Sequence, residues 1–411
     1  MRPRSAAVMP TIPPSELKRR VEELRRWLSE ASVEAAYISN PVNIFYLTNL
    51  AFIQTERPLS LIVPVDGQIT LILPSVERGH AEYRNSRWGG IVESFMYYFD
   101  YPGETHVANF IADAISRLGV KGVALDNAMG ATGVYGYQGP ALGELLKARG
   151  IGVKDLGDYF AKKRLIKSND EISLLEESGR WASRAIDVAR ELIRPGKWDW
   201  EAALEANLEI SREMNKYYSP YVPLRGAVGW AVGFRGQVGE YSAFPHALVS
   251  ERPFREGDVI GIGAGPEIGG YSAELERTLL LGGSPKPQVA SLFNAMLELR
   301  RAALETIRAG VKASDVDRAV RRRAKELGVA DLLLHHVGHG IGLEEHEPPF
   351  LDVGYDITLS ENMVVSVEPG IYANGLGGFR HSDTVLVTKD GYRLLTHYPE
   401  DLESLTIEVR S

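Results

Sequence analysis

The pattern of apolar residues changes near residue 160, and this change constrains the fold more than any other feature of the sequence. Before it, short apolar runs such as Glu34 to Ile38 alternate with helical patterns such as Glu16 to Ala31. The Asn40-Pro41 pair after the first run predicts a tight turn. Alternating strands and helices predict an α/β domain of about 150 residues.

Beyond residue 160 the pattern is that of an α+β domain. A charged junction precedes a helical pattern that ends at Leu192, and Asn169 or Asp170 is placed to cap it. From Ala227 onward, glycine-rich strands dominate, with two late helical patterns. Since 411 residues exceed one ordinary core, we predict two domains, an α/β domain at 1–160 and an α+β domain at 161–411.

Composition excludes several classes of function. The net charge is −8, and no long run of lysine and arginine suggests a nucleic-acid-binding face. There is no cysteine, so disulfides and thiolate chemistry are excluded. No apolar run is long enough to span a bilayer, and the first residues lack the apolar core of a secretion signal. We therefore expect a soluble, cytoplasmic protein that binds neither nucleic acid nor membrane.

Two carboxylates stand on one face of a predicted strand from Tyr271 to Leu281. Residues two apart in a strand face the same way, so Glu274 and Glu276 lie on one side of the sheet. Buried together, they repel each other, and one is expected to hold a proton near neutral pH, as a general acid does. The alternative is a solvated sheet face. Arg277 on the other face and the leucines that follow favour burial.

Three further segments carry residues suited to a pocket. Glu368 ends the apolar strand from Val364 to Val367 and precedes a Pro-Gly turn. His339 and His346 belong to the stretch GHGIGLEEHEPP, where glycines allow close approach of the backbone. His246 lies in SAFPHAL, and histidine titrates near neutral pH without assistance. Each alone is equally compatible with a structural or surface role, but together they predict one pocket.

These motifs, with MVVSVEPGIY and GGFRHSDTVLVT, resemble those of the pita-bread hydrolases. This family includes methionine aminopeptidase, Xaa-Pro dipeptidase (prolidase), aminopeptidase P and creatinase. The resemblance covers the whole chain, including an N-terminal creatinase-type domain. It implies a pita-bread α+β catalytic domain preceded by an α/β domain, and a homodimer.

The resemblance also implies a metal site that this chain has partly lost. Most members hold two divalent metals, and their five ligand positions fall here on Gly263, Glu274, His339, Glu368 and Ser382. Gly263 and Ser382 cannot bind a metal strongly. Their neighbours do not help, since strand alternation points His381 and Asp383 to the opposite face from Ser382. The remaining set suffices for one metal at most.

Creatinase works without metal, and the match to it is close on the strand SAELERT. Its catalytic histidine falls on His246, and its two glutamates fall on Glu276 and Glu368. The arginine that binds the substrate carboxylate from the partner subunit falls on Arg57, and arginine suits this role because its planar fork donates two parallel hydrogen bonds. An ordinary surface arginine is the alternative. Glu274 departs from creatinase, which has alanine there.

From this resemblance we predict a creatinase-like, metal-independent hydrolase that cleaves a C–N bond in a small polar substrate bearing a carboxylate, with no cofactor. The predicted catalytic residues are His246, Glu276 and Glu368. The predicted substrate-binding residues are Arg57, Glu274, His339 and His346. One alternative is a metallopeptidase of the Xaa-Pro dipeptidase or aminopeptidase P type, which acts on Xaa-Pro bonds with one Mn, Co or Zn ion on Glu274, His339 and Glu368. The other is a non-catalytic binding protein on the same fold.

Overall fold

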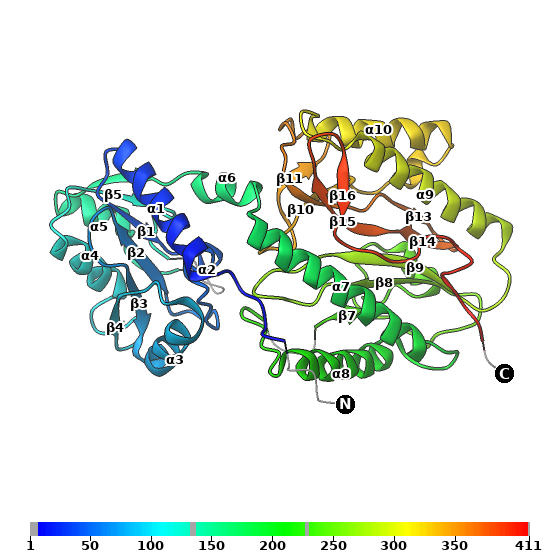
Figure 1. Ribbon diagram of the computed structural model, residues 1–411, viewed down its shortest axis with the longest axis horizontal. Coiled ribbons are helices and arrows are strands. Elements are labelled where there is room, and N and C mark those ends of the chain that lie inside the picture. The colour runs from blue at the N-terminus through cyan, green and yellow to red at the C-terminus, as the bar shows by residue number, and fades with distance from the viewer. Residues whose placement is uncertain (1–6, 132–136, 227–229, 410–411) are drawn as a thin grey trace. The chain divides into compact units, whose positions relative to one another are not determined.

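The computed structural model describes residues 7–131, 137–226 and 230–409, which form two compact units (Figure 1). One unit spans residues 11–162, and the other consists of residues 7–10 and 163–409. The first is an α/β unit and the second an α+β unit, so the predicted fold class is confirmed.

A mixed six-stranded sheet forms the first unit, in the order β4-β3-β2-β1-β5-β6. Its strands are β1 (Ala35–Ile38), β2 (Ser60–Pro64), β3 (Thr70–Pro74), β4 (Ser94–Tyr98), β5 (Gly122–Leu125) and β6 (Gly152–Asp155). Its helices are α1 (Pro14–Glu30), α2 (Pro41–Thr48), α3 (Arg78–Arg84), α4 (Val107–Arg117) and α5 (Leu142–Ala148), with short turns η1 (Ser75–Glu77) and η2 (Asn85–Gly89). Residues of α4 and α5, such as Ile111 and Leu146, pack in one core with Tyr37 and Val123 of the sheet.

The helix α2 corrects one prediction. We expected a tight turn at Asn40-Pro41, but the Asn40 side chain accepts hydrogen bonds from the backbone N–H groups of Val42 and Asn43 and caps a helix. Proline fits the first position of a helix because its missing N–H has no partner there. The helix ends at Asn49, which takes the left-handed conformation with φ 58°.

The second unit is built on a nine-stranded sheet with the main order β11-β10-β12-β15-β9-β8-β7; β16 pairs with β15 and β17 with β9. Its strands are β7 (Val232–Gly233), β8 (Val259–Ala264), β9 (Leu275–Leu281), β10 (Gly338–Gly340), β11 (Glu347–Leu351), β12 (Val364–Val367), β15 (Ser382–Val387), β16 (Tyr392–Leu394) and β17 (Thr406–Ile407), beside the hairpin of β13 (Gly370–Ala373) and β14 (Gly377–Arg380). Its helices are α7 (Asn169–Leu192), α8 (Asp199–Tyr218), α9 (Pro287–Thr306) and α10 (Ala313–Glu326), with η3 (Gly239–Ala243) and η4 (Ala330–Leu332); α6 (Tyr159–Leu165) spans the boundary between the units. Helix α7 packs against α8, and α9 against α10 (Figure 1).

The register of the central strands places three positions in one row. Glu276 on β9 lies opposite Gly263 on β8 and opposite Ser382 on β15. The strand β9 begins at Leu275, later than predicted. The reason lies at Glu274, whose backbone N–H and C=O both bond the Thr384 hydroxyl instead of a ladder partner.

The opposite face of β15 is occupied as predicted. Asp383 is fully buried and forms ion pairs with Arg277 and Arg300. The ring of His381 lies 5.3 Å from that of Phe293, centre to centre. Neither side chain replaces the carboxylate that Ser382 lacks, which confirms the expectation from strand alternation.

Among the residues that the structure describes, no helix is both long and apolar enough to cross a membrane.

The start of α7 gives a first testable prediction. Ser168, and not Asn169 or Asp170 as expected, caps this helix. Its hydroxyl bonds the Glu171 N–H, and the Glu171 carboxylate accepts from the Ser168 N–H. Replacing Ser168 by alanine should lower the free energy of unfolding by about 1 kcal/mol. The midpoint of thermal unfolding should fall by about 2–4 °C. The substitution Ser173→Ala, at an exposed serine of the same helix, should lower this midpoint less. Equal shifts would contradict the capping argument.

Candidate metal centre

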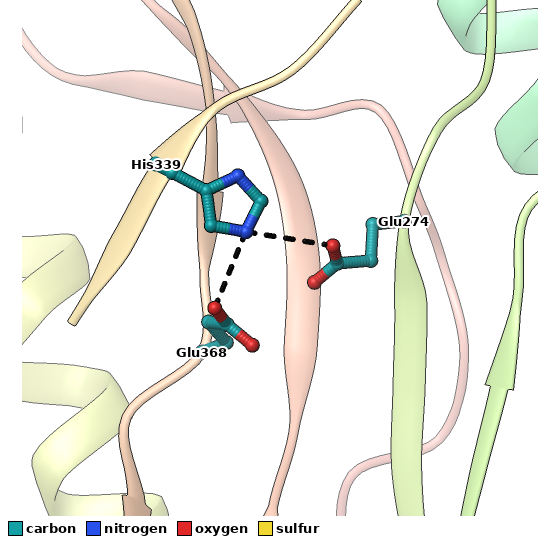
Figure 2. Close-up of side chains that lie close together, drawn as sticks. All are labelled: Glu274, His339 and Glu368. Carbon is teal, nitrogen blue, oxygen red and sulfur yellow. Dashed lines mark ion pairs between the residues drawn. The ribbon is translucent and has the colours of Figure 1, made fainter. Parts of the chain in front are cut away.

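Three side chains from one strand and from the ends of two others converge in the second unit. His339 comes from β10, Glu368 directly follows β12, and Glu274 directly precedes β9 (Figure 2). The imidazole Nε2 of His339 lies 3.3 Å from Glu368 Oε1 and 3.7 Å from Glu274 Oε2. One ligand atom from each residue falls within 4.8 Å of the others. One nitrogen and two carboxylate oxygens form a donor set suited to Mn, Co or Zn.

The surroundings of His339 fix which nitrogen faces the carboxylates. Its ring is fully buried, and its Nδ1 lies 3.0 Å from the carbonyl oxygen of Gly340. A hydrogen bond to a carbonyl requires Nδ1 to carry the proton, so in the neutral ring the Nε2 lone pair points toward the two glutamates. Nε2 makes no hydrogen bond of regular geometry with the described protein atoms. This buried nitrogen between two carboxylates fits a divalent metal.

The charges of the three residues affect one another's protonation. Burial opposes the imidazolium of His339, but Glu368 and Glu274 outweigh burial and raise its pKa to about 9. Burial, with the charges of Glu368 and Glu276, raises the pKa of Glu274 well above its usual range. For Glu368, burial acts upward, but His339 and Arg380 outweigh it and lower its pKa. The pocket therefore favours a cation between the glutamates, either a proton on His339 or a metal.

Two hydroxyls hold Glu274 in place. Its Oε1 accepts a hydrogen bond of 2.7 Å from Ser366 and a second from Ser382, and the two serine oxygens lie 2.8 Å apart. Because both hydroxyls bind the same oxygen, the other, Oε2, remains directed toward His339. Ser382 thus orients a carboxylate at a position where the resemblance leads one to expect a metal ligand.

Glu276 is paired with two arginines. Arg380 on β14 contacts both carboxylate oxygens, with Nε 2.5 Å from Oε2 and Nη2 2.8 Å from Oε1. Arg235, whose side chain is 49% exposed, also binds Oε1. A Cβ atom placed on Gly263 would lie 3.1 Å from Glu276 Oε1 and 3.2 Å from its Cγ. Glu276 therefore fills the space that a larger side chain at Gly263 would need.

The loop after His339 places a second imidazole over the first. The rings of His346 and His339 stack with their centres 3.8 Å apart and their planes 14° apart. His346 is exposed, and its pKa is lowered by partial burial and by its neighbour His339. Glu347 anchors the end of this loop, since its buried carboxylate binds Lys167 at 2.6 Å and also binds Arg164.

Two of the predicted site residues lie outside this cluster. His246 is exposed in the turn after η3, and among the described residues no hydrogen bond or ion pair joins it to His339 or Glu368. Arg57 belongs to the first unit, where its Nε lies 2.8 Å from Asp100 Oδ1. The roles assigned to both residues stay predictions.

The sequence interpretation missed several residues around the pocket. Arg380 stands directly before the HSD stretch, and Ser366 is the one polar residue of VVSV; both signals were visible in the sequence. Arg235 gave no such signal, because its position follows from the turn after β7. Tyr372, whose hydroxyl lies 2.8 Å from His335 Nε2 and 3.4 Å from Arg380 Nη1, follows from the hairpin of β13 and β14.

Comparison with known proteins identifies the family. The profile of Metallopeptidase family M24 matches residues 173–389, and that of the Creatinase/Prolidase N-terminal domain matches residues 20–138. The chain belongs to metallopeptidase family M24. It is therefore a hydrolase, as predicted, with the pita-bread fold that its motifs resemble.

Similar proteins cover nearly the whole chain. The Xaa-Pro dipeptidase of Pyrococcus furiosus is 29% identical over 392 residues, which are 94% of this chain and 100% of the relative. The prolidase structure from Pyrococcus horikoshii OT3 matches with a TM-score of 0.74 at 25% identity, over 93% of this chain and 99% of that one. Dipeptidase PepE from Mycobacterium ulcerans matches with a TM-score of 0.76 at 26% identity, over 97% and 100%.

These findings correct two predictions. The creatinase-like, metal-independent hydrolase is wrong, because the family is one of metallopeptidases and the similar proteins are named as dipeptidases and prolidases. The expectation of no cofactor is wrong for the same reason, and because Glu274, His339 and Glu368 converge as a group that could hold a metal ion. The losses at Gly263 and Ser382 were given too much weight against the three groups that remain.

The anchor at Glu347 gives a second testable prediction. Burial would raise its pKa, but Lys167 and Arg164 outweigh burial and lower it. The stabilisation is therefore complete above the ordinary pKa of a glutamate, about 4.3, and is lost as pH falls through the lowered value. The substitution Glu347→Gln should lower the free energy of unfolding by about 3 kcal/mol at neutral pH, since it breaks a buried ion pair.

Unfolding measured across acid and neutral pH checks this. The difference in the free energy of unfolding between wild type and Glu347→Gln should become smaller as the pH falls. The variant Glu345→Gln, at the exposed neighbour, should have a free energy of unfolding close to that of wild type at every pH. A difference independent of pH would argue against the ion pair.

Proposed function

We propose that this protein is a metal-dependent peptidase that hydrolyses Xaa-Pro dipeptides, with one divalent ion held by Glu274, His339 and Glu368. The observation that carries the proposal is the buried Nε2 of His339, which faces one oxygen of each glutamate. The names of the similar proteins, Xaa-Pro dipeptidase and prolidase, support the substrate class. Mn, Co and Zn are the ions that this donor set favours.

A divalent ion bound there would polarise the scissile carbonyl and lower the pKa of a bound water. The protein supplies the remaining parts. Ser366 and Ser382 hold Glu274 so that Oε2 faces His339. The Gly340 carbonyl fixes the tautomer of His339. His346, exposed and stacked on the ring of His339, can accept or donate a proton beside the metal centre.

Other roles complete the proposal. His246 would shuttle a proton to the leaving nitrogen, and Arg57 would bind a substrate carboxylate, as predicted from the sequence. Homodimerisation and a cytoplasmic location also stay predictions, and the oligomeric state can be measured by sedimentation.

A panel of dipeptides tests the function directly. Purified protein that has been treated with a chelator should not hydrolyse Xaa-Pro dipeptides, and addition of Mn²⁺, Co²⁺ or Zn²⁺ should restore the activity. Dipeptides without proline in the second position serve as the comparison. Full activity after exhaustive chelation, or no turnover of any Xaa-Pro dipeptide with all three ions, would contradict the proposal.

A substitution at the histidine ligand tests the assignment of the site. His339→Ala should lose tight metal binding and lower kcat/KM by at least on the order of 100-fold, because even outer partners of metal ligands cost 10–100-fold. His397→Ala, at an exposed histidine of the same unit, is the matched control and should retain both. Metal content after dialysis and steady-state kinetics provide the two measurements. Retained metal in His339→Ala would place the ion elsewhere.

A further inference from the structure

Each glutamate of the metal centre has one oxygen facing His339 and one facing away. Oε2 of Glu274 and Oε1 of Glu368 face the imidazole. We call the other two the outer oxygens. The outer oxygen of Glu274, Oε1, accepts hydrogen bonds from Ser366 and Ser382. The outer oxygen of Glu368, Oε2, lies 3.8 Å from Nε of Arg380. The outer oxygen of Glu274 thus already has two hydrogen-bond donors, and the outer oxygen of Glu368 has a guanidinium at ion-pair distance.

The side chains of Glu276 and Arg380 occupy the space beside the outer oxygens. The Glu276 side chain lies over Gly263, within 3.1–3.2 Å of where a Cβ would be. Arg380 binds both oxygens of Glu276 and is itself buried. Tyr372 lies 3.4 Å from its Nη1. The guanidinium is therefore held by several contacts and does not depend on Glu368 for its position.

The charge of Arg380 also disfavours a second metal ion next to Glu368. A second divalent ion bound to the outer oxygen of Glu368 would stand beside the fixed cation of Arg380, and it would have to compete with two hydroxyls for the outer oxygen of Glu274. Coulomb repulsion between like charges a few ångströms apart is strong in a buried site. Oε1 of Glu276 accepts hydrogen bonds from Arg380 and Arg235. Oε2 makes no hydrogen bond of regular geometry, but it lies 2.5 Å from Nε of Arg380, so a second metal ion there would stand against the guanidinium.

Resting on the proposed function, we infer that the Glu276–Arg380 ion pair limits this pocket to one divalent ion, with the Arg380 guanidinium supplying the positive charge on the outer side of Glu368. Arg380 is then a positioning residue with an electrostatic role: it orients Glu368 toward the ion and balances its second oxygen. The site then contains two positive charges of different kinds, one bound metal ion and the guanidinium of Arg380.

Metal counting without substrate tests this inference. Titration of the full chain with Mn²⁺, followed by equilibrium dialysis and elemental analysis, should give one tightly bound ion per chain. Electron paramagnetic resonance should show an isolated Mn²⁺ signal without coupling to a neighbour. Two ions of comparable affinity with a coupled signal in the wild type would overturn the inference, with no variant required.

Two variants at Arg380 separate charge from structure. Arg380→Met removes the cation and leaves the outer oxygen of Glu368 free, so a second Mn²⁺ should bind and the count should rise from one toward two. Arg380→Lys keeps the charge and should stay at one. If Arg380→Met does not fold, Arg380→Met combined with Glu276→Gln removes both charges of the pair and frees only Glu368, and it should bind at most a weak second ion. A count of one in a folded Arg380→Met, or of two in Arg380→Lys, would overturn the role given to Arg380.

Metal counting and the activity assay test the inference and the proposed function separately. Two bound ions with hydrolysis of Xaa-Pro dipeptides would overturn the single-ion inference and leave the function standing. One bound ion without hydrolysis would support the inference and argue against the substrate class. No bound ion would overturn both the metal centre and the inference built on it.

Discussion

Neutralising two buried glutamates and a third that is partly buried is the constraint on which the site depends. Glu274, Glu276 and Glu368 come from neighbouring segments of one sheet, and each meets a different partner: hydroxyls, guanidinium groups and an imidazole. A buried carboxylate without such a partner would be protonated or would destabilise the fold. The partners come from β10, β12, β14, β15 and the turn after β7, so the site forms only when these segments are assembled. The carboxylates are therefore neutralised only once the sheet has assembled.

Most of the fold could be predicted from the sequence, because its signals are local. The apolar spacing of α1 and α7 and the alternation in the first unit have the periods of their structures. The errors have local causes as well. Asn40-Pro41 is compatible with a turn and with a helix start, and only the bonds to Val42 and Asn43 decide between them. At α7 the predicted capping residues, Asn169 or Asp170, lie one and two positions after the observed cap Ser168, since serine, asparagine and aspartate all serve in that role.

The site was predicted in part. Glu274, His339 and Glu368 were identified as the possible ligands of one ion, and the face assigned to His381 and Asp383 was correct. What spacing could not provide was the identity of the partners of each carboxylate. Arg235 and Arg380 reach Glu276 from a turn and from a hairpin that lie far from it in the sequence. Without these two arginines Glu276 has the appearance of a carboxylate that is free to take part in catalysis.

The clamp on Glu347 has a consequence for the boundary of the catalytic unit. Arg164 lies on α6 and Lys167 just after it, upstream of the long helix α7, yet both bind the carboxylate that ends the loop of His346. A fragment cut at the start of α7 would leave this acid in the interior without its counterions. The segment from residue 163 to the start of α7 is thus a structural part of the catalytic unit, because it fixes the end of the loop that carries His346 over His339.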